Sequence, residues 1–423
     1  MATTNTLDTG IASASLLNLS SINRDKLFTA SCVSLLVTSL TFGIRAGILG
    51  QLGEQYHLSN TELGQIASMA FLGFPLATFL GGFFVDLLGM RRFMLMAFIA
   101  HLLGLILTVF AGGYWTLMIS TLLIGFANGT VEAVCNPLIG TMYPENKVTM
   151  FNKFHVWFPG GIVIGALLSL LMTKMGITGQ LQCAIIIIPT LYYGFLFFKE
   201  KFPQTERVTS GVTTQQMYAS ILTPLFLFMA ACMFLTANTE LSTNQWVNKL
   251  LGNAGASALL ILALVNGIMA FGRFFGEGII HRLAPEGVLF MSAILATLGI
   301  YLLSTTTGPM LYLAAIVFAC GVCYFWPTML GYVSEKMPQS GALGLSVMGG
   351  IGMGGNALYQ SLFLGPKLDS VTADTTATAS TTGLTSNQIE LVAGQTVLHY
   401  INFLPLILVV AFGYLYFSSR NKK

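Results

Sequence analysis

The stretch GGFFVDLLGMRR, Gly81 to Arg92, is a short polar turn between two long apolar segments. Its polar and small residues follow the spacing Gly82-x-x-x-Asp86-x-x-Gly89-x-Arg91-Arg92. A small residue such as Gly82 lets a neighbouring helix approach closely, and Gly89 permits a tight turn after a helix. The two arginines can pair with acids or with lipid headgroups on one side of a membrane. The stretch therefore predicts two membrane-crossing helices joined by a short loop.

The composition agrees with a membrane protein. The chain has 423 residues, of which 54% are hydrophobic and only 8% are charged. A soluble domain carries roughly 25% charged residues, so these charges are too few to cover a globular surface. The net charge of +3 gives no reason to expect a nucleic acid partner. All six Cys residues fall in apolar runs, which is typical of small core residues and not of a disulfide framework.

Twelve segments are long and apolar enough to cross a bilayer, which takes about 20 residues. They lie near 27–50, 62–85, 93–112, 115–142, 154–173, 183–199, 221–247, 256–281, 288–306, 309–333, 341–364 and 396–418.

The positions of Lys and Arg give the orientation of these spans. With both termini inside, 14 of the 19 Lys and Arg residues fall on the inner side, three on the outer side and two within spans. This bias predicts a multi-pass protein of the cytoplasmic membrane with both termini in the cytoplasm. No secretory signal precedes the first span. The outer segment 367–391 is rich in Thr, and we expect it to be mobile.

The longest inner connection divides the chain into two halves of six spans. We expect a cytoplasmic tail at 1–26, a first six-helix bundle at 27–199, a linker at 200–220, a second bundle at 221–418 and a short tail at 419–423. The two halves contain related motifs. Near the end of the fourth span lies NPLIGTMYPE, which corresponds to WPTMLGYVSEKMP in the tenth. The fifth span contains FPGGIVIG, which corresponds to VMGGIGMGG in the eleventh. Such paired halves are typical of transporters built from structural repeats.

With the twelve spans and two halves, the loop from Gly82 to Arg92 resembles the signature inner loop of the major facilitator superfamily. The resemblance implies an all-α fold of two pseudo-symmetric six-helix bundles that rock against each other to give alternating access. It also implies that Asp86 latches the inner side of the outward-open state. The alternative is that these charges only set the topology. The corresponding loop of the second half, GEGIIHRLAPEG, is degenerate.

Three further stretches are similar to a narrower branch, the fucose–proton symporters and bacterial sugar transporters. They are EAVCNPLIG in the fourth span, TELSTNQWV in the seventh, and FWPTMLGYVSEKMPQSGALGLSVMGG across the tenth and eleventh. This resemblance implies a sugar-like solute and coupling to protons. One departure concerns the first span, where the acid of this branch would fall at about Ala46, beside Arg45.

Polar residues inside the spans predict where a solute binds. Asn128, Glu132 and Asn136 fall at i, i+4 and i+8 on one helix, and such a stripe is expected to face a water-filled cavity. The alternative is hydrogen bonding between helices within one bundle. The candidates for contact with the solute are Arg45, Asn128, Asn136, Glu240, Gln245, Trp246, Asn266, Tyr324, Trp326, Asn356 and Gln360.

Glu132 is the only acid near the middle of the first-half spans. An isolated carboxylate is costly to place in an apolar run, so a functional role is expected. A site that opens alternately to each side can load and release a proton, and we therefore expect Glu132 to couple transport to protons. The alternative is that Glu132 only hydrogen-bonds the solute.

Two arginines lie within spans and need partners. Depth favours Glu240 as the partner of Arg45, whereas the polar stripe favours Glu132. If Arg45 pairs with neither, it is a site for an anionic solute. Arg273 can pair with Glu277, one turn further along the same helix.

The sequence therefore favours a secondary transporter of a sugar or a similar small polar solute, driven by protons. A carrier of a nucleoside or small organic anion and a drug–proton exporter remain alternatives, although polar stripes suit a hydroxylated ligand better than a drug. A membrane sensor would need a cytoplasmic output domain, which the short loops do not provide. No metal-ligand cluster or nucleophile motif suggests an enzyme, so we expect no catalytic residues, metal or cofactor. The expected partners are the solute, protons and the lipid bilayer, with the chain acting as a monomer.

Overall fold

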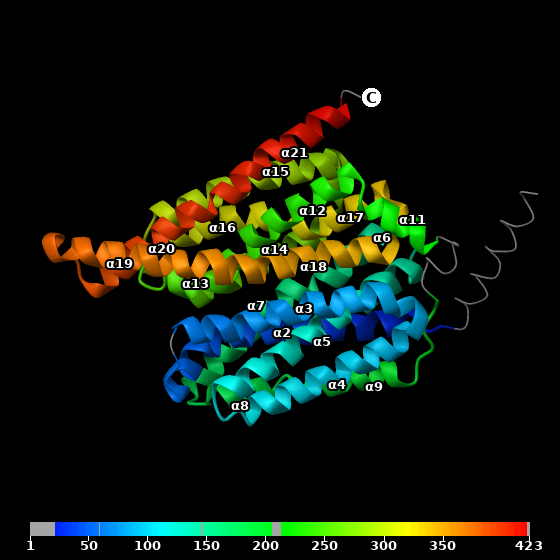
Figure 1. The fold of residues 1–423 in the computed structure, drawn as a ribbon, viewed down its shortest axis with the longest axis horizontal. Coiled ribbons are helices and arrows are strands. Elements are labelled where there is room, and N and C mark those ends of the chain that lie inside the picture. The colour runs from blue at the N-terminus through cyan, green and yellow to red at the C-terminus, as the bar shows by residue number, and fades with distance from the viewer. Residues whose placement is uncertain (1–21, 59, 145–146, 205–212, 421–423) are drawn as a thin grey trace, which may run out of the picture.

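The computed structural model describes residues 22–58, 60–144, 147–204 and 213–420. Within these ranges the chain forms helices and no strands. Most of the helices run side by side along the longest axis of the molecule (Figure 1). The two ends of the described chain lie at the same end of the molecule, which we call the inner side after the orientation predicted from the charges.

The helices of the first half form the lower bundle in Figure 1. They are α2 (Arg24–Tyr56), α3 (Asn60–Leu88), α4 (Met90–Val109), α5 (Tyr114–Met142), α6 (Lys147–His155), α7 (Trp157–Lys174), α8 (Gly179–Ala184) and α9 (Ile187–Phe198).

The second half forms the upper bundle (Figure 1). It contains α11 (Thr214–Ile221), α12 (Pro224–Ala237), the π-helix η1 (Asn238–Ser242), α13 (Thr243–Leu251), α14 (Ala258–Phe275), α15 (Glu277–Thr305), α16 (Met310–Val322), α17 (Phe325–Lys336), the 3-10 turn η2 (Pro338–Ser340), α18 (Gly341–Tyr359), the π-helix η3 (Gln360–Leu364), α19 (Gly365–Thr382), α20 (Ser386–Ile401) and α21 (Phe403–Arg420).

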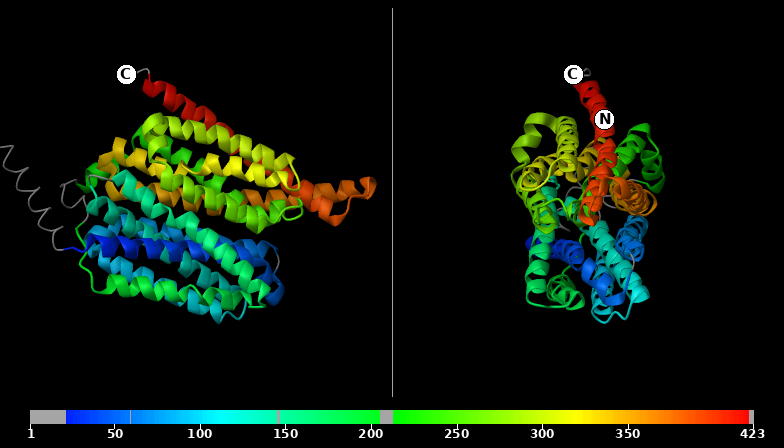
Figure 2. Two further views of the ribbon diagram at one scale, coloured as in Figure 1. Left: turned by 180° about the vertical axis from the view of Figure 1, so that it is seen from behind. Right: turned by 90° about the vertical axis from the view of Figure 1, so that its left-hand side faces the viewer.

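Two helix pairs make the main contacts between the bundles. Helix α18 packs on α3, and α14 packs on α7. The side and end views confirm that the two bundles are stacked with these helices between them (Figure 2). An all-helical fold of two six-helix bundles is therefore confirmed.

Eleven helical segments of the described chain are long and apolar enough to cross a membrane. They correspond to all the predicted spans except the eleventh, at 341–364. That segment is formed by α18 and η3, which cross the molecule beside α3 (Figure 1). Its many glycines make it less apolar than the others. The structure is thus consistent with twelve crossing segments.

Two connections differ from the sequence-based expectations. The Thr-rich segment 367–391, expected to be mobile, is helical over most of its length: α19 and α20 form a hairpin that projects beyond the rest of the bundle (Figure 1). Helix α20 begins at a capping box, in which the side chains of Thr385 and Gln388 each bond to the main chain of the other residue. The linker at 200–220 contains the start of α11, which opens with a second capping box at Thr213.

Glycines set the closest helix contacts. The position of Gly125 in α5 lies against the main chain of Ala70 in α3, and a side chain there would collide with the Ala70 carbonyl oxygen. In the same way Gly165 of α7 lies against Gly43 of α2, with only 3.2 Å between the position of an added Cβ and the Gly43 Cα. Gly160, in the same helix as Gly165, faces open space instead.

Candidate functional site

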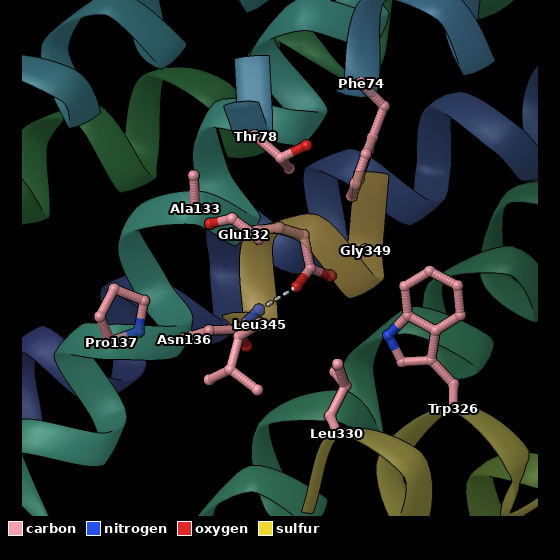
Figure 3. Close-up of a pocket in the computed structure, with 11 residues that line it drawn as sticks. Phe74, Thr78, Glu132, Ala133, Asn136, Pro137, Trp326, Leu330, Leu345 and Gly349 are labelled. Carbon is pink, nitrogen blue, oxygen red and sulfur yellow. Dashed lines mark hydrogen bonds between the residues drawn. The ribbon is translucent and has the colours of Figure 1, made fainter. Parts of the chain in front are cut away.

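A cavity lies between the two bundles, in the inner half of the molecule. Helices α3 and α5 contribute its wall on one side, and α17 and α18 contribute the other (Figure 3). It contains about 340 Å³ of empty space, its opening included. The lining residues are Phe74, Thr78, Glu132, Ala133, Asn136, Pro137, Trp326, Leu330, Leu345, Ser346 and Gly349.

Glu132 projects into this cavity from α5 (Figure 3). Asn136, one turn further along the same helix, donates a hydrogen bond of 2.7 Å from Nδ2 to Glu132 Oε2. The Asn136 Oδ1 atom lies 3.2 Å from Nε2 of His155, at the end of α6. The side chains of Glu132, Asn136 and His155 therefore form a continuous buried chain of polar groups, which extends from the cavity to α6.

Pro137 adds a main-chain acceptor to the same wall. Proline has no N–H, so the carbonyl of Ala133, four residues earlier in α5, lacks its usual helical donor. Ala133 and Pro137 both line the cavity. A carbonyl freed in this way can accept a hydrogen bond from a hydroxyl or a water in the cavity.

An ion pair in the second half lies close to this chain. Arg273 in α14 lies 3.7 Å from Glu240 in η1, measured from Nη2 to Oε1, and both side chains are almost fully buried. The Arg273 Nε donates to the carbonyl of Cys323 at 2.8 Å, which fixes the guanidinium between α14 and the end of α16. Arg273 also interacts electrostatically with Glu132 and His155 across the two halves. Arg273 therefore forms an ion pair with Glu240 of its own half and acts on Glu132 of the other half only electrostatically.

This arrangement corrects the expected partner of Arg45. The partner of Glu240 is Arg273, and the cation that acts on Glu132 is also Arg273. Arg45 instead lines a second cavity, inside the first bundle. The side chain of Glu277, the other expected partner of Arg273, lies outside the part of the chain that is described.

Asn128 also points away from the cavity between the bundles. Its Oδ1 lies 2.8 Å from Nε2 of His101, and its Nδ2 donates to the hydroxyl of Thr41 at 3.1 Å. The other ring nitrogen of His101 lies 2.9 Å from the hydroxyl of Tyr193. These bonds join α2, α4, α5 and α9 inside the first bundle, so the alternative of interhelical hydrogen bonding holds for Asn128.

A second polar network joins the two π-helices of the second half. Trp246 donates from Nε1 to Oε1 of Gln360 at 3.0 Å, and Gln360 donates in turn to Asn356. Asn356 donates to Asn238 at 3.1 Å and to Ser242 at 2.9 Å. Three of the predicted contact residues, Trp246, Asn356 and Gln360, are thus brought together, but outside the lining of the cavity between the bundles. Gln245 lies half-buried beside Trp246.

Three other predicted residues have different surroundings. Asn266 donates to the carbonyl of Leu262 in its own helix at 2.9 Å. The hydroxyl of Tyr324 donates to the carbonyl of Gly272 at 2.8 Å, which ties α14 to the start of α17. Trp326, by contrast, presents its indole ring to the cavity, as expected of a residue that contacts solute (Figure 3).

The inner loop of the first half makes the expected turn. Gly89 adopts a φ of +82°, in the region that glycine favours, and it separates α3 from α4. Arg91 donates to the carbonyl of Phe198 at 2.8 Å and so binds the end of α9, while Arg92 is exposed. Gly82 falls within α3. The side chain of Asp86 lies outside what is described, and the expected latch at Asp86 stays a prediction.

Sequence reasoning missed some residues of this site. His155 carries no signal of its own in the sequence, and neither do Thr78 and Ser346, which lie in apolar helices. Arg273 was considered only as a partner of Glu277. A signal was available for Arg273, because it and Glu240 are oppositely charged residues within spans of the same half.

The comparisons with known proteins cover different shares of the chain. A family model described as the Major Facilitator Superfamily matches residues 31–359. Facilitated glucose transporter member 10 of Danio rerio is 26% identical over 204 residues, which are 45% of this chain and 40% of that protein. The hexuronate transporter of Bacillus subtilis (strain 168) is 22% identical over 291 residues, 62% of this chain and 68% of that protein. The chain thus spans well under two thirds of the length of the glucose transporter.

Solved structures share the fold at low sequence identity. The proton:xylose symporter crystallised with 6-bromo-6-deoxy-D-glucose superposes with a TM-score of 0.69 at 13% identity, covering 91% of this chain and 96% of that chain. The Escherichia coli fucose:proton symporter gives a TM-score of 0.61 at 15% identity, covering 90% of this chain and 98% of that chain.

Proposed function

The chain belongs to the major facilitator superfamily, and we propose that it is a secondary transporter that moves a sugar or a similar small polar solute by alternating access. The observation that carries this proposal is the cavity between the two bundles, into which Glu132 and Asn136 project from one half and Trp326 from the other. A solute held there contacts both halves and can follow their movement.

The cavity lining suits a hydroxylated solute. Thr78, Asn136 and Ser346 offer small polar groups on three helices, and the free carbonyl of Ala133 adds an acceptor. Trp326 offers a flat apolar surface against which the face of a sugar ring can stack. The similarity to transporters described as carrying glucose and hexuronate supports the same class of solute.

We further propose that Glu132 couples transport to protons. Glu132 faces the cavity, bonds to Asn136 and lies within electrostatic range of Arg273, which also pairs with Glu240. When Glu132 takes up a proton, Arg273 keeps only Glu240 as its ionised partner, so the attraction between the halves weakens. This change links the proton on Glu132 to the contact between the bundles. Two neighbours of the same fold are described as proton symporters, which supports the idea.

A second candidate solute is a small organic anion such as a sugar acid. Arg273 favours this candidate because its buried guanidinium acts electrostatically on Glu132, which lines the cavity. A protonated Glu132 would leave part of the positive charge of Arg273 available to a carboxylate. The similarity to a hexuronate transporter points in the same direction.

The proposed setting is the cytoplasmic membrane, with the inner side of the molecule facing the cytoplasm and the chain acting as a monomer. The basic residues near the inner ends of the helices support this orientation. Among them, Lys26 pairs with Glu200 at 2.7 Å, and Arg91 binds the end of α9.

Uptake by proteoliposomes tests these proposals. The purified protein is assayed against a panel of pentoses, hexoses, hexuronates and nucleosides, with and without an inward proton gradient. We expect one sugar or sugar acid to accumulate, and the proton gradient to raise the accumulated amount. Exchange of no sugar or sugar acid would contradict the proposed solute class, and accumulation that ignores the proton gradient would contradict proton coupling alone.

A further inference from the structure

A second cavity lies inside the first bundle, apart from the cavity between the halves. All its lining residues fall between Thr41 and Ile186, and it contains about 440 Å³ of empty space, its opening included. Leu52, Ile66 and Leu117 line it near the outer ends of their helices. Most of the lining is aliphatic and none of it is acidic.

Arg45 lines this cavity with unsatisfied donors. The side chain is 8% exposed, and its Nε and Nη2 atoms make no hydrogen bond within the described part of the chain. The guanidinium carbon stands 4.9 Å from the centre of the Phe42 ring. This contact offsets only part of the cost of burying a charge that has no counter-charge. Arg45 therefore needs a partner of negative charge.

Besides the free thiol of Cys183, the lining contains one hydroxyl without a hydrogen bond. The hydroxyls of Thr41 and Thr108 donate to main-chain carbonyls of their own helices, at 2.6 Å and 2.9 Å. The hydroxyl of Thr121 in α5 makes no hydrogen bond to any described residue. The polar groups still available to a ligand are thus the Arg45 cation, the Thr121 hydroxyl and the weakly polar Cys183 thiol, each of which can donate a hydrogen bond.

We propose that this cavity binds a small monovalent anion of halide size, held by Arg45 and Thr121. A single cation balances a single negative charge, and the aliphatic lining offers no second cation for a divalent ion. Because every lining residue belongs to the first bundle, the anion stays with that bundle when the two halves move. It is a resident ion that stabilises the first bundle and not the transported solute. The inference uses none of the residues that line the cavity between the halves and is independent of the proposed transport function.

Thermal unfolding of the purified full chain in detergent tests the site. The protein is prepared without halide, and its unfolding temperature is compared in sodium chloride, sodium bromide, sodium acetate and sodium gluconate at equal ionic strength. We expect chloride and bromide to raise the unfolding temperature by about 3 °C or more over gluconate, because a ligand of the folded state stabilises it by mass action. Arg45→Gln should abolish this difference. In gluconate it should unfold no earlier than the unaltered protein, because the unpaired charge is gone.

Two isosteric variants of the same lining provide matched controls. Thr121→Val should reduce the halide effect several-fold, whereas Thr108→Val, whose hydroxyl already bonds within its helix, should leave it unchanged. The proposal is overturned if the unaltered protein does not respond to halide, or if Arg45→Gln responds equally. A response to acetate alone would also overturn it, because the site would then take a carboxylate.

Discussion

At the scale of single residues, the position of Glu132 could be predicted because a lone acid in an apolar run has few possible roles. The directions in which the neighbouring Asn side chains point could not be predicted. A helix turns about 100° per residue, so Asn128 and Asn136, eight residues apart, differ by about 80° around the helix. That angle is enough for Asn136 to face the cavity while Asn128 faces His101 inside the bundle. The orientation of Arg45 was misjudged for a related reason. Ser31, Ser34, Thr38 and Thr41 precede Arg45 in α2 at spacings of three and four residues, and these residues are buried. Such a polar stripe does not show whether it faces the other half or the inside of its own bundle.

The first prediction concerns Glu132. Glu132→Gln keeps the shape of the side chain and removes its titration. If Glu132 carries the coupling proton, the variant should lose proton-driven accumulation and keep counterflow exchange of the same solute. Both are measured in proteoliposomes. Accumulation equal to that of the unaltered protein would remove Glu132 from the coupling mechanism. Loss of binding as well as accumulation would place Glu132 in the solute site.

The second prediction concerns the buried pair of Arg273 and Glu240. Arg273→Gln leaves Glu240 buried without its cation, and breaking such a pair costs about 3–5 kcal/mol. We expect a marked fall in the unfolding temperature of the purified protein. Glu240→Gln in the same chain should restore much of the lost unfolding temperature, because no uncompensated charge remains.

A second pair of variants tests whether Arg45 interacts with Glu240. Arg45→Gln combined with Glu240→Gln should give additive effects on the unfolding temperature, since Arg45 is not the partner of Glu240. Strong coupling between Arg45 and Glu240 would contradict the pairing described above.

At the scale of elements, the helices follow from hydropathy because a backbone inside a bilayer must satisfy its own hydrogen bonds. The interruptions were harder to foresee. The π-helix η1 contains the acid Glu240, and η3 ends just before Pro366, but neither feature distinguishes a π-helix from an α-helix in the sequence. Hydrogen bonds from Asn356 to η1 and from Trp246 to η3 join these two segments in the structure. The hairpin of α19 and α20 was missed because its Thr-rich composition suggests a loop, whereas packing of the two helices on each other orders it.

The third prediction concerns the contact of α3 with α5. An added methyl group at Gly125 would collide with the carbonyl of Ala70, so Gly125→Ala should force the two helices apart and cost roughly 1–3 kcal/mol. Gly50→Ala is the matched control, because this position is also helical but faces open space. Ala favours a helix over Gly by about 1 kcal/mol, so the control should be neutral or slightly stabilising. Thermal unfolding in detergent compares the two. Equal effects would show that the α3–α5 spacing does not depend on Gly125.

At the scale of the whole molecule, the division into halves could be predicted from the long charged linker and the repeated motifs. The way in which the two halves pack on each other could not be predicted, because it depends on which helices face each other after folding. The structure pairs α3 with α18 and α7 with α14, and Arg273 of the second half acts electrostatically on Glu132 of the first. Movement of one half relative to the other must therefore change the surroundings of Glu132. The residue pattern of a single helix does not reveal this dependence.

The fourth prediction tests whether that movement is needed for transport. A Cβ added at Gly350 in α18 would lie 3.4 Å from the hydroxyl of Thr78 in α3, which is close to the spacing a disulfide requires. A chain with Thr78→Cys and Gly350→Cys, and with the exposed Cys320 replaced by Ser, should therefore form a disulfide between the halves under mild oxidation.

If the halves rock against each other, this cross-link holds α3 and α18 together and stops the inner side from opening. The oxidised protein should lose uptake, and a reducing agent should restore it in the same sample. Each single Cys variant, treated with the same oxidant, controls for damage to the cavity wall at Thr78. Mass spectrometry verifies that the cross-link has formed. If the oxidised and reduced forms of the double variant then show equal uptake, the solute crosses without separation of α3 from α18. Alternating access by rocking would have to be abandoned.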